Sequence, residues 1–197
     1  MTLWEMSKED GTLVGYVPDT NLSMELVGCG NPMAVRRTFE QARANPVDMQ
    51  LGKPLGDTVE RSKQDIPDFV IWSWMAIFSG RVVSMAIEMG CVATEFWSCR
   101  FQTNPDEKFF FHLPEKTLDI VDVERSAFRH MLPLNPPVPM FFERLVTRPV
   151  TEYIPPCFRA EIPGRGQIFR ELFVRDDFKL AWEKRGFTGA AFRRLTE

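Results

Sequence analysis

Near the C-terminal end of the chain, the apolar positions follow the period of a helix, and apolar runs flank them on both sides. Phe178, Ala181 and Trp182 recur at i, i+3 and i+4, which places them on one face of a short amphipathic helix. The apolar run 168–174 before this helix and residues 190–195 after it predict strands. The aromatic side chains of the helix and of its flanking runs present a large apolar surface, which favours their burial in a protein core. The pattern therefore predicts a strand, helix and strand unit that docks onto a sheet supplied by earlier segments.

Local signals mark both ends of this predicted helix. Asp176 and Asp177 stand where carboxylates complement the positive end of a helix dipole. Gly186 is placed to end the helix in a left-handed conformation, and Gly189 permits a second tight bend before the last strand. The C-terminal region thus carries its own start and stop signals.

Strands and helices are mixed along the rest of the chain. Residues 2–7 and 12–17 are predicted to pair as a hairpin, because a polar tetrapeptide ending in glycine joins two β-prone runs. Helices are expected to start at Asn31 and at Arg81. Further strands are expected at 92–101, 108–113, 117–121 and 141–147. The expected fold class is therefore α+β, with a mixed and largely antiparallel sheet and a few short helices.

A stretch that is poor in large apolar residues divides the chain. Residues 46–67 contain glycine and proline and predict a long exposed connection, and connections of this length are often functional or mobile. We therefore expect an N-terminal part, residues 1–67, that contains the hairpin, one helix and the connection. This part is expected to pack on an α+β domain formed by residues 68–197.

The composition is that of an ordinary folded chain, with 44% hydrophobic and 26% charged residues among 197. The formal net charge is -3, but it is unevenly distributed. Residues 1–147 carry 14 Lys and Arg against 20 Asp and Glu, whereas residues 148–197 carry 10 against 7. The acidic excess of the larger part disfavours a basic nucleic-acid-binding protein. No direct nucleic-acid binding is therefore expected.

The four cysteines, Cys29, Cys91, Cys99 and Cys157, lie far apart and form no CxxC pair. Such spacing disfavours a structural zinc site, so no metal is predicted. The N-terminal residues lack a basic start followed by an apolar core, so no secretory signal is predicted. We expect a cytoplasmic protein with reduced thiols.

The most apolar run, residues 69–78, is about ten residues long, whereas a membrane-spanning helix needs about 20. Burial in a protein core explains this run, and no membrane contact is expected. The search for catalytic motifs is also negative. Gly28-Cys29-Gly30 lacks the third glycine of a dinucleotide loop, and neither GxxxxGK[ST] nor GxSxG occurs. No cofactor and no catalytic residue are predicted.

The two histidines carry no catalytic signal. His112 lies in a strand-like run, where a packed or solvent-facing imidazole is expected. His130 is expected on a helix and exposed. A small cytoplasmic hydrolase or transferase, whose site is assembled only in the fold, remains the alternative class of function, because catalytic groups converge from distant positions in many enzymes.

Six short segments occur in a distinctive order across the last two thirds of the chain. They are Asp68-Phe69-Val70, Val82-Val83-Ser84, Glu95-Phe96, Asp119 to Ser126, Ile168-Phe169 and Gly186 to Gly189. Over residues 68–196 this order resembles the eleventh immunity-protein family of bacterial polymorphic toxin systems. The resemblance implies a non-enzymatic antitoxin that blocks a toxin, encoded by a neighbouring gene, through direct binding. Partners of such families are often nucleases.

The acidic residues offer candidates for contact with such a toxin. A toxin that binds nucleic acid needs a positive surface, so an inhibitor that covers it gains association rate and specificity from complementary acids. The candidates are Asp57, Glu60 and Asp65 in the long connection and Asp119, Asp122 and Glu124 near a predicted strand end. Asp122 has an alternative role, because with Ser126 it could cap the turn that leads to Phe128.

Overall fold

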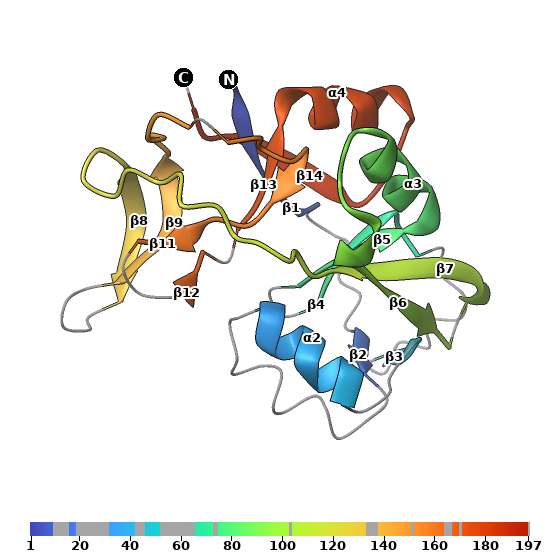
Figure 1. Cartoon of the computed structure of the whole chain (residues 1–197). Coiled ribbons are helices and arrows are strands. Elements are labelled where there is room, and N and C mark those ends of the chain that lie inside the picture. Colours follow the sequence, from blue (N-terminus) through green and yellow to red (C-terminus); the bar gives the residue numbers. More distant parts are fainter. Residues whose placement is uncertain are drawn as a thin grey trace, which may run out of the picture.

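The computed structural model of the chain describes most of its residues (Figure 1). They are residues 1–9, 16–18, 32–41, 46–51, 66–72, 75–102, 104–132, 138–150, 152–163, 167–169 and 171–196. Helices and strands are mixed and most strand pairs are antiparallel, so the predicted α+β class is confirmed. Within these residues, no helix has the length and apolar character needed to cross a membrane.

A six-stranded sheet forms the larger layer. In spatial order it contains β2 (Tyr16–Pro18), β3 (Val47–Leu51), β6 (Phe96–Phe101), β7 (Asn104–His112), β5 (Met75–Ser79) and β4 (Phe69–Trp72). β3 and β6 are parallel, and the other neighbouring pairs are antiparallel. β5 is buried along its whole length, as expected for a strand covered on both faces.

Two helices cover opposite faces of this sheet. Side chains alternate along a strand, so Phe109 and Phe111 of β7 share one face, where they pack in a core with Val35 and Phe39 of α2 (Pro32–Gln41). Phe78 of β5 belongs to the core on the other face, with the buried side of α3 (Gly80–Glu88). Figure 1 accordingly shows α2 below the sheet and α3 above it.

A four-stranded antiparallel sheet packs beside the first. Its order is β10 (Cys157–Phe158), β13 (Leu172–Arg175), β1 (Leu3–Lys8) and β14 (Ala190–Arg194). α4 (Asp176–Lys184) follows β13 directly, and β1 lies between β13 and β14. The strand, helix and strand unit predicted for the C-terminal region is confirmed, and the strand on which it docks comes from the N-terminal end of the chain.

Two short strand pairs complete the described fold. β8 (Ala127–Leu132) pairs with β9 (Val138–Arg144), and β11 (Glu161–Ile162) pairs with β12 (Gln167–Ile168). A single 3-10 turn, Ala93–Glu95, precedes β6. Figure 1 shows the β8 and β9 pair standing out on the left, away from α3 and α4.

One apolar core joins the two large sheets. Val174 of β13 and Phe178 and Trp182 of α4 belong to the same buried cluster as Phe69 and Phe78 of the six-stranded sheet. Trp182 is only 3% exposed, and its ring makes edge contacts with the rings of Phe69, Phe187 and Phe192. The helical face predicted from the sequence is therefore the buried face.

The buried Asp68 carboxylate ties the two sheets together. It lies immediately before β4 and accepts hydrogen bonds from the Ser79 hydroxyl at 2.6 Å and from Nε and Nη2 of Arg81 at 2.6 and 2.5 Å. It also accepts the backbone N–H of Thr188 at 3.0 Å, and Thr188 belongs to the turn between α4 and β14. The Phe69 N–H donates to the Thr188 carbonyl oxygen at 3.2 Å. We refer to these contacts of Asp68 and Phe69 with the turn before β14 as the seam.

Gly189 fits this seam because it has no side chain. Its φ is +91°, and a Cβ added there would lie 2.5 Å from the Phe69 carbonyl oxygen and 2.7 Å from the Cβ of Pro67. The C-terminal turn can therefore approach β4 only with glycine at this position. Gly186, with φ of +64°, ends α4 in the predicted left-handed conformation.

Four predictions about local structure are wrong. The expected hairpin of 2–7 with 12–17 does not form, because β1 pairs with β13 and β14 whereas β2 pairs with β3. Part of the expected connection 46–67 is β3, whose Val47 and Met49 are buried and alternate with Asp48. His130 lies in β8, not on a helix.

The expected strand 117–121 is also absent, since only isolated bridges occur there, at Leu118 and Val121. Apart from His130, whose strand pairs with the neighbouring β9, these errors came from local patterns whose backbone pairing is decided by a partner far away in the sequence.

We predict that Trp182→Ala lowers the free energy of unfolding by about 3–5 kcal/mol, because it leaves a cavity between the two sheets. Urea unfolding followed by circular dichroism measures this loss. Leu180→Ala is the matched control, because Leu180 lies on the same helix but is 57% exposed, and its effect should stay within about 0.5 kcal/mol. Equal effects for the two variants would contradict the assignment of the helix faces.

We predict that Asp68 gives the fold an acid-sensitive component. Burial raises its pKa, but hydrogen bonds from Arg81, Ser79 and Thr188 outweigh burial and hold the pKa below the ordinary value of 3.8. The pKa of Asp68 is lower in the folded state than in the unfolded chain, so the ionised carboxylate stabilises the fold above about pH 4. This contribution disappears as the pH falls through the folded-state pKa.

Asp68→Asn should therefore cost roughly 1–3 kcal/mol at pH 7 and progressively less as the pH falls below about 4. Urea unfolding of parent and variant between pH 3 and 7 measures this difference. Asp48→Asn removes a carboxylate whose pair with Arg100 is exposed, so it should change little. A loss for Asp68→Asn that is constant over the whole pH range would contradict the role of the charge.

Candidate functional site

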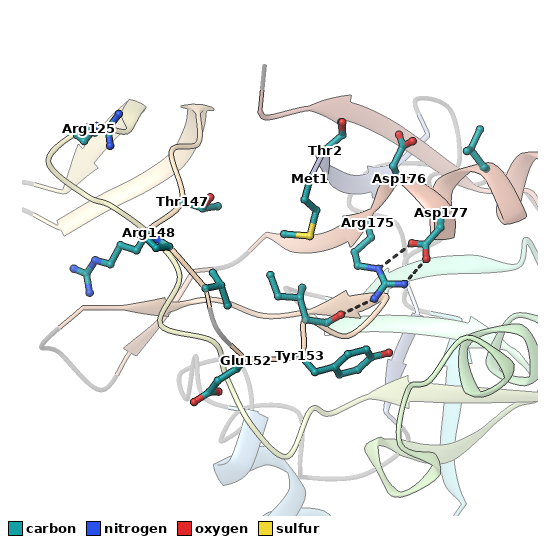
Figure 2. A pocket seen from close by; sticks show the side chains of 14 residues that line it. Met1, Thr2, Arg125, Thr147, Arg148, Glu152, Tyr153, Arg175, Asp176 and Asp177 are labelled. Carbon is teal, nitrogen blue, oxygen red and sulfur yellow. Dashed lines mark hydrogen bonds and ion pairs between the residues drawn. The ribbon is translucent and has the colours of Figure 1, made fainter.

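A surface groove of about 980 Å³ lies between α4 and the segment that precedes β10 (Figure 2). One wall comes from the start of α4, including Arg175, Asp177 and Leu180, together with the first two residues of the chain. The other wall comes from residues 147–150 and 152–154 and from Arg125. The groove is therefore assembled from four parts of the chain that are separated in the sequence.

Several interactions hold the Arg175 side chain in place at this groove. Its Nε donates to Oδ1 of Asp177 at 3.0 Å, a second guanidinium nitrogen contacts Oδ2, and Nη1 donates to the Ile154 carbonyl oxygen at 2.8 Å. The guanidinium carbon also lies 5.8 Å from the centre of the Tyr153 ring. The hydrogen bond between Arg175 and Asp177 lowers the pKa of Asp177 and raises the pKa of Arg175.

Large apolar side chains are exposed around the same corner of the molecule. Of the described residues, five large hydrophobic side chains are exposed, namely Met1, Ile87, Val92, Tyr153 and Leu180. Met1, Tyr153 and Leu180 line the groove. The other two lie within three residues of Gly90, where the Tyr153 hydroxyl donates to the Met89 carbonyl oxygen at 3.3 Å. We refer to the three that line the groove, Met1, Tyr153 and Leu180, as the apolar corner.

The acidic candidates that the structure describes lie behind the far wall of the groove. Asp119 is exposed and accepts hydrogen bonds from Nη1 of Arg148 at 3.2 and 3.1 Å. Glu124 is exposed in the turn before β8. Since Arg148 lines the groove, Asp119 is adjacent to it. The other candidates, Asp57, Glu60 and Asp65, lie outside the described residues.

Asp122 organises the turn that leads to β8. Its Oδ1 accepts the Arg125 N–H at 3.1 Å, and its carbonyl oxygen accepts the Ser126 N–H at 2.9 Å. The Ser126 hydroxyl accepts the Val146 N–H at 2.9 Å and lies 3.3 Å from the Val146 carbonyl oxygen. The capping role that the sequence left open for Asp122 and Ser126 is therefore present, and it positions Arg125 at the groove.

A second group of chemically reactive side chains is buried between the two sheets. Sγ of Cys157 lies 3.6 Å from Sγ of Cys91 and 3.8 Å from Nε2 of His112, and Oε2 of Glu95 lies 4.0 Å from the same Nε2. No motif predicts this group, because Cys91 and Cys157 are 66 positions apart in the sequence. The packed environment that was one expectation for His112 is confirmed, since it is 2% exposed.

This buried group lacks the arrangement of a nucleophilic triad. In a triad, the nucleophile and the carboxylate face opposite ring nitrogens of the histidine, whereas here both face Nε2, and Nδ1 has no hydrogen-bond partner in the described part of the chain. Burial and the charge of Arg159 lower the pKa of His112 to about 3. The hydrogen bond with Cys91 and burial raise the pKa of Cys157. The thiol therefore remains protonated beside a neutral imidazole.

Within the described residues, no three His, Cys, Asp or Glu side chains are arranged to hold a metal ion. Comparison with known proteins adds no name: no protein-family model matches the chain, and no curated protein matches it. The groove and the apolar corner are therefore the features from which a function has to be argued.

Proposed function

We propose that the protein is an immunity protein, which neutralises a cognate bacterial toxin by binding to it directly, and that the groove and the apolar corner form the binding surface. The observation that carries this proposal is that three of the five large hydrophobic side chains exposed among the described residues line one groove. Exposed apolar residues that are scattered singly need no explanation, but a contiguous group rimmed by charges is typical of a protein interface.

The residue types at this corner are those that contribute most to protein association. Tyrosine, methionine and arginine are enriched in interfaces, and Tyr153, Met1 and Arg175 meet in the groove. Tyr153 is 61% exposed and Leu180 is 57% exposed, so each can still bury much of its side chain against a partner. Full burial of such a side chain contributes about 1.5–3 kcal/mol.

The groove is also organised before any partner arrives. Tyr153 is fixed by its hydrogen bond to Met89 and by the guanidinium of Arg175 over its ring. Arg175 is fixed in turn by Asp177 and by the Ile154 carbonyl. Because these side chains are already ordered, binding costs less conformational entropy. A preformed surface of this kind suits an inhibitor that must act quickly on a toxin.

The segments that resemble the immunity-protein family serve the framework in this structure. Asp68 and Thr188 join the two sheets, and Asp122 and Ser126 form the turn behind the groove. The hydrogen bonds of these four residues hold the framework that carries the groove. This arrangement supports a binding function over the hydrolase or transferase alternative. A nuclease is the toxin class that the acidic excess of residues 1–147 suits.

We predict that coexpression of this protein restores growth to cells that produce the toxin encoded beside its gene. The measurement is the growth of toxin-producing cells with and without the protein, with immunoblotting to show that both proteins are made. A catalytically inactive toxin should copurify with it. If well-expressed protein leaves killing unchanged and no complex forms, the immunity function is wrong.

We predict that Tyr153→Ala and Leu180→Ala each weaken toxin binding at least about tenfold, because each removes an apolar contact from the centre of the interface. Calorimetry or surface plasmon resonance measures the affinity, and circular dichroism confirms the fold. Asp106→Ala is the control, since Asp106 is exposed in β7 and does not line the groove. Unchanged affinity for both groove variants would place the interface elsewhere.

The same binding measurement tests the acidic candidates. Glu124→Lys should slow association and flatten its dependence on salt, because Glu124 would no longer attract a positive toxin surface. The dissociation rate should change less than it does for Leu180→Ala. An association rate and a salt dependence equal to those of the parent would remove Glu124 from the interface.

A further inference from the structure

Cys91 and Cys157 form a buried pair of thiols, and each lies within four positions of a residue that takes part in the Tyr153 to Met89 hydrogen bond. Their sulfur atoms are 3.6 Å apart, which is van der Waals contact. Cys91 follows α3 and Cys157 begins β10, so the pair bridges the two sheet systems across 66 positions of sequence. The third thiol among the described residues, Cys99, is buried in the core on the opposite face of the six-stranded sheet.

The two thiols of the pair differ in access and in acidity. Cys91 retains 5% exposure and Cys157 only 1%, so a small oxidant reaches Cys91 first. The hydrogen bond with Cys157 lowers the pKa of Cys91, whereas the same bond and burial raise the pKa of Cys157. The more accessible Cys91 is therefore the thiol that meets an oxidant, and Cys157, in contact with it, is placed to resolve the oxidised sulfur.

We propose that Cys91 and Cys157 are a redox modification site that forms a reversible disulfide when the protein meets a hydroperoxide. The inference rests on the geometry of the pair and stands independently of the immunity function. Disulfide formation requires the sulfur atoms to approach from 3.6 Å to about 2.0 Å, which rotation of the two side chains can supply.

The reaction is balanced with hydrogen peroxide as the oxidant. The Cys91 thiolate attacks one peroxide oxygen, the O–O bond breaks, and the departing hydroxide takes up the proton that Cys91 released, giving one water and a sulfenic acid on Cys91. The Cys157 sulfur then attacks the Cys91 sulfur. The S–O bond breaks, and the hydroxyl leaves with the Cys157 proton as a second water. Two thiols are oxidised to one disulfide while one peroxide is reduced to two waters.

The disulfide would lock the apolar corner. Cys91 directly follows Gly90, which contacts the Tyr153 hydroxyl, and Cys157 lies four positions after Tyr153. The reduced protein holds these two segments together through the hydrogen bond from Tyr153 to Met89. A covalent bond at the same place would fix the end of α3 against the segment that carries Tyr153 and so fix one wall of the groove.

The test treats the full-length protein with a few equivalents of hydrogen peroxide and maps its cysteines without reduction. The expected result is a mass loss of about 2 Da, a linked peptide that contains Cys91 and Cys157, and a melting temperature raised by about 5 °C or more. Dithiothreitol should reverse all three changes. A monomer without this linked peptide, a sulfinic acid on Cys91, or a disulfide between molecules would overturn the proposal.

Two variants separate the roles of the two thiols. Cys157→Ala should leave Cys91 as a sulfenic acid that dimedone traps, and Cys91→Ala should abolish both the linked peptide and the dimedone adduct. Cys99→Ala is the matched control, because Cys99 is equally buried but lies in the other core, and it should form the disulfide as the parent does. Loss of the disulfide in Cys99→Ala would show that the pairing had been misassigned.

Discussion

The Asp68 carboxylate is the interaction on which the arrangement of the two sheets depends. A buried carboxylate is costly unless its oxygens accept hydrogen bonds, and Asp68 receives them from β5, α3 and the turn before β14. Arg81 supplies a bidentate pair from the first turn of α3. One side chain therefore sets the distance between the six-stranded sheet and the C-terminal unit. The close approach of Gly189 to Phe69 completes the same seam.

This seam explains why the C-terminal unit cannot be a separate body. β1 lies between β13 and β14, so the two ends of the chain share one sheet. Phe178 and Trp182 then close the core that this sheet shares with α3 and β5. Successive side chains of β13 enter different cores. Val174 belongs to the core that contains Phe178 and Trp182, whereas Phe173 belongs to a separate core on the other face of the four-stranded sheet. Any change at the seam is therefore transmitted to both sheets.

The sequence predicted the parts of the fold that depend on nearby residues. The face of α4, the end of that helix at Gly186 and the burial of residues 69–72 follow from periodicity and from the conformational freedom of glycine. Strand pairing does not, because the partners of β1 and β2 lie far away in the sequence. The groove was missed for the same reason, and so was the contact between Cys91 and Cys157. Only the capping residues Asp122 and Ser126 carried a local signal of their role.

The charges around the groove decide what kind of partner contact it can make. Arg175 is paired with Asp177, Arg148 with Asp119, and Arg125 with Asp122. A partner gains little by displacing an existing ion pair, because it must desolvate its own charge to replace one that is already neutralised. Leu180 has no such competing interaction with charge, and Tyr153, although its ring faces the Arg175 guanidinium, is still 61% exposed. Affinity at this site should therefore come from burial of those two side chains, whereas acids at the rim set the rate of association and the choice of partner.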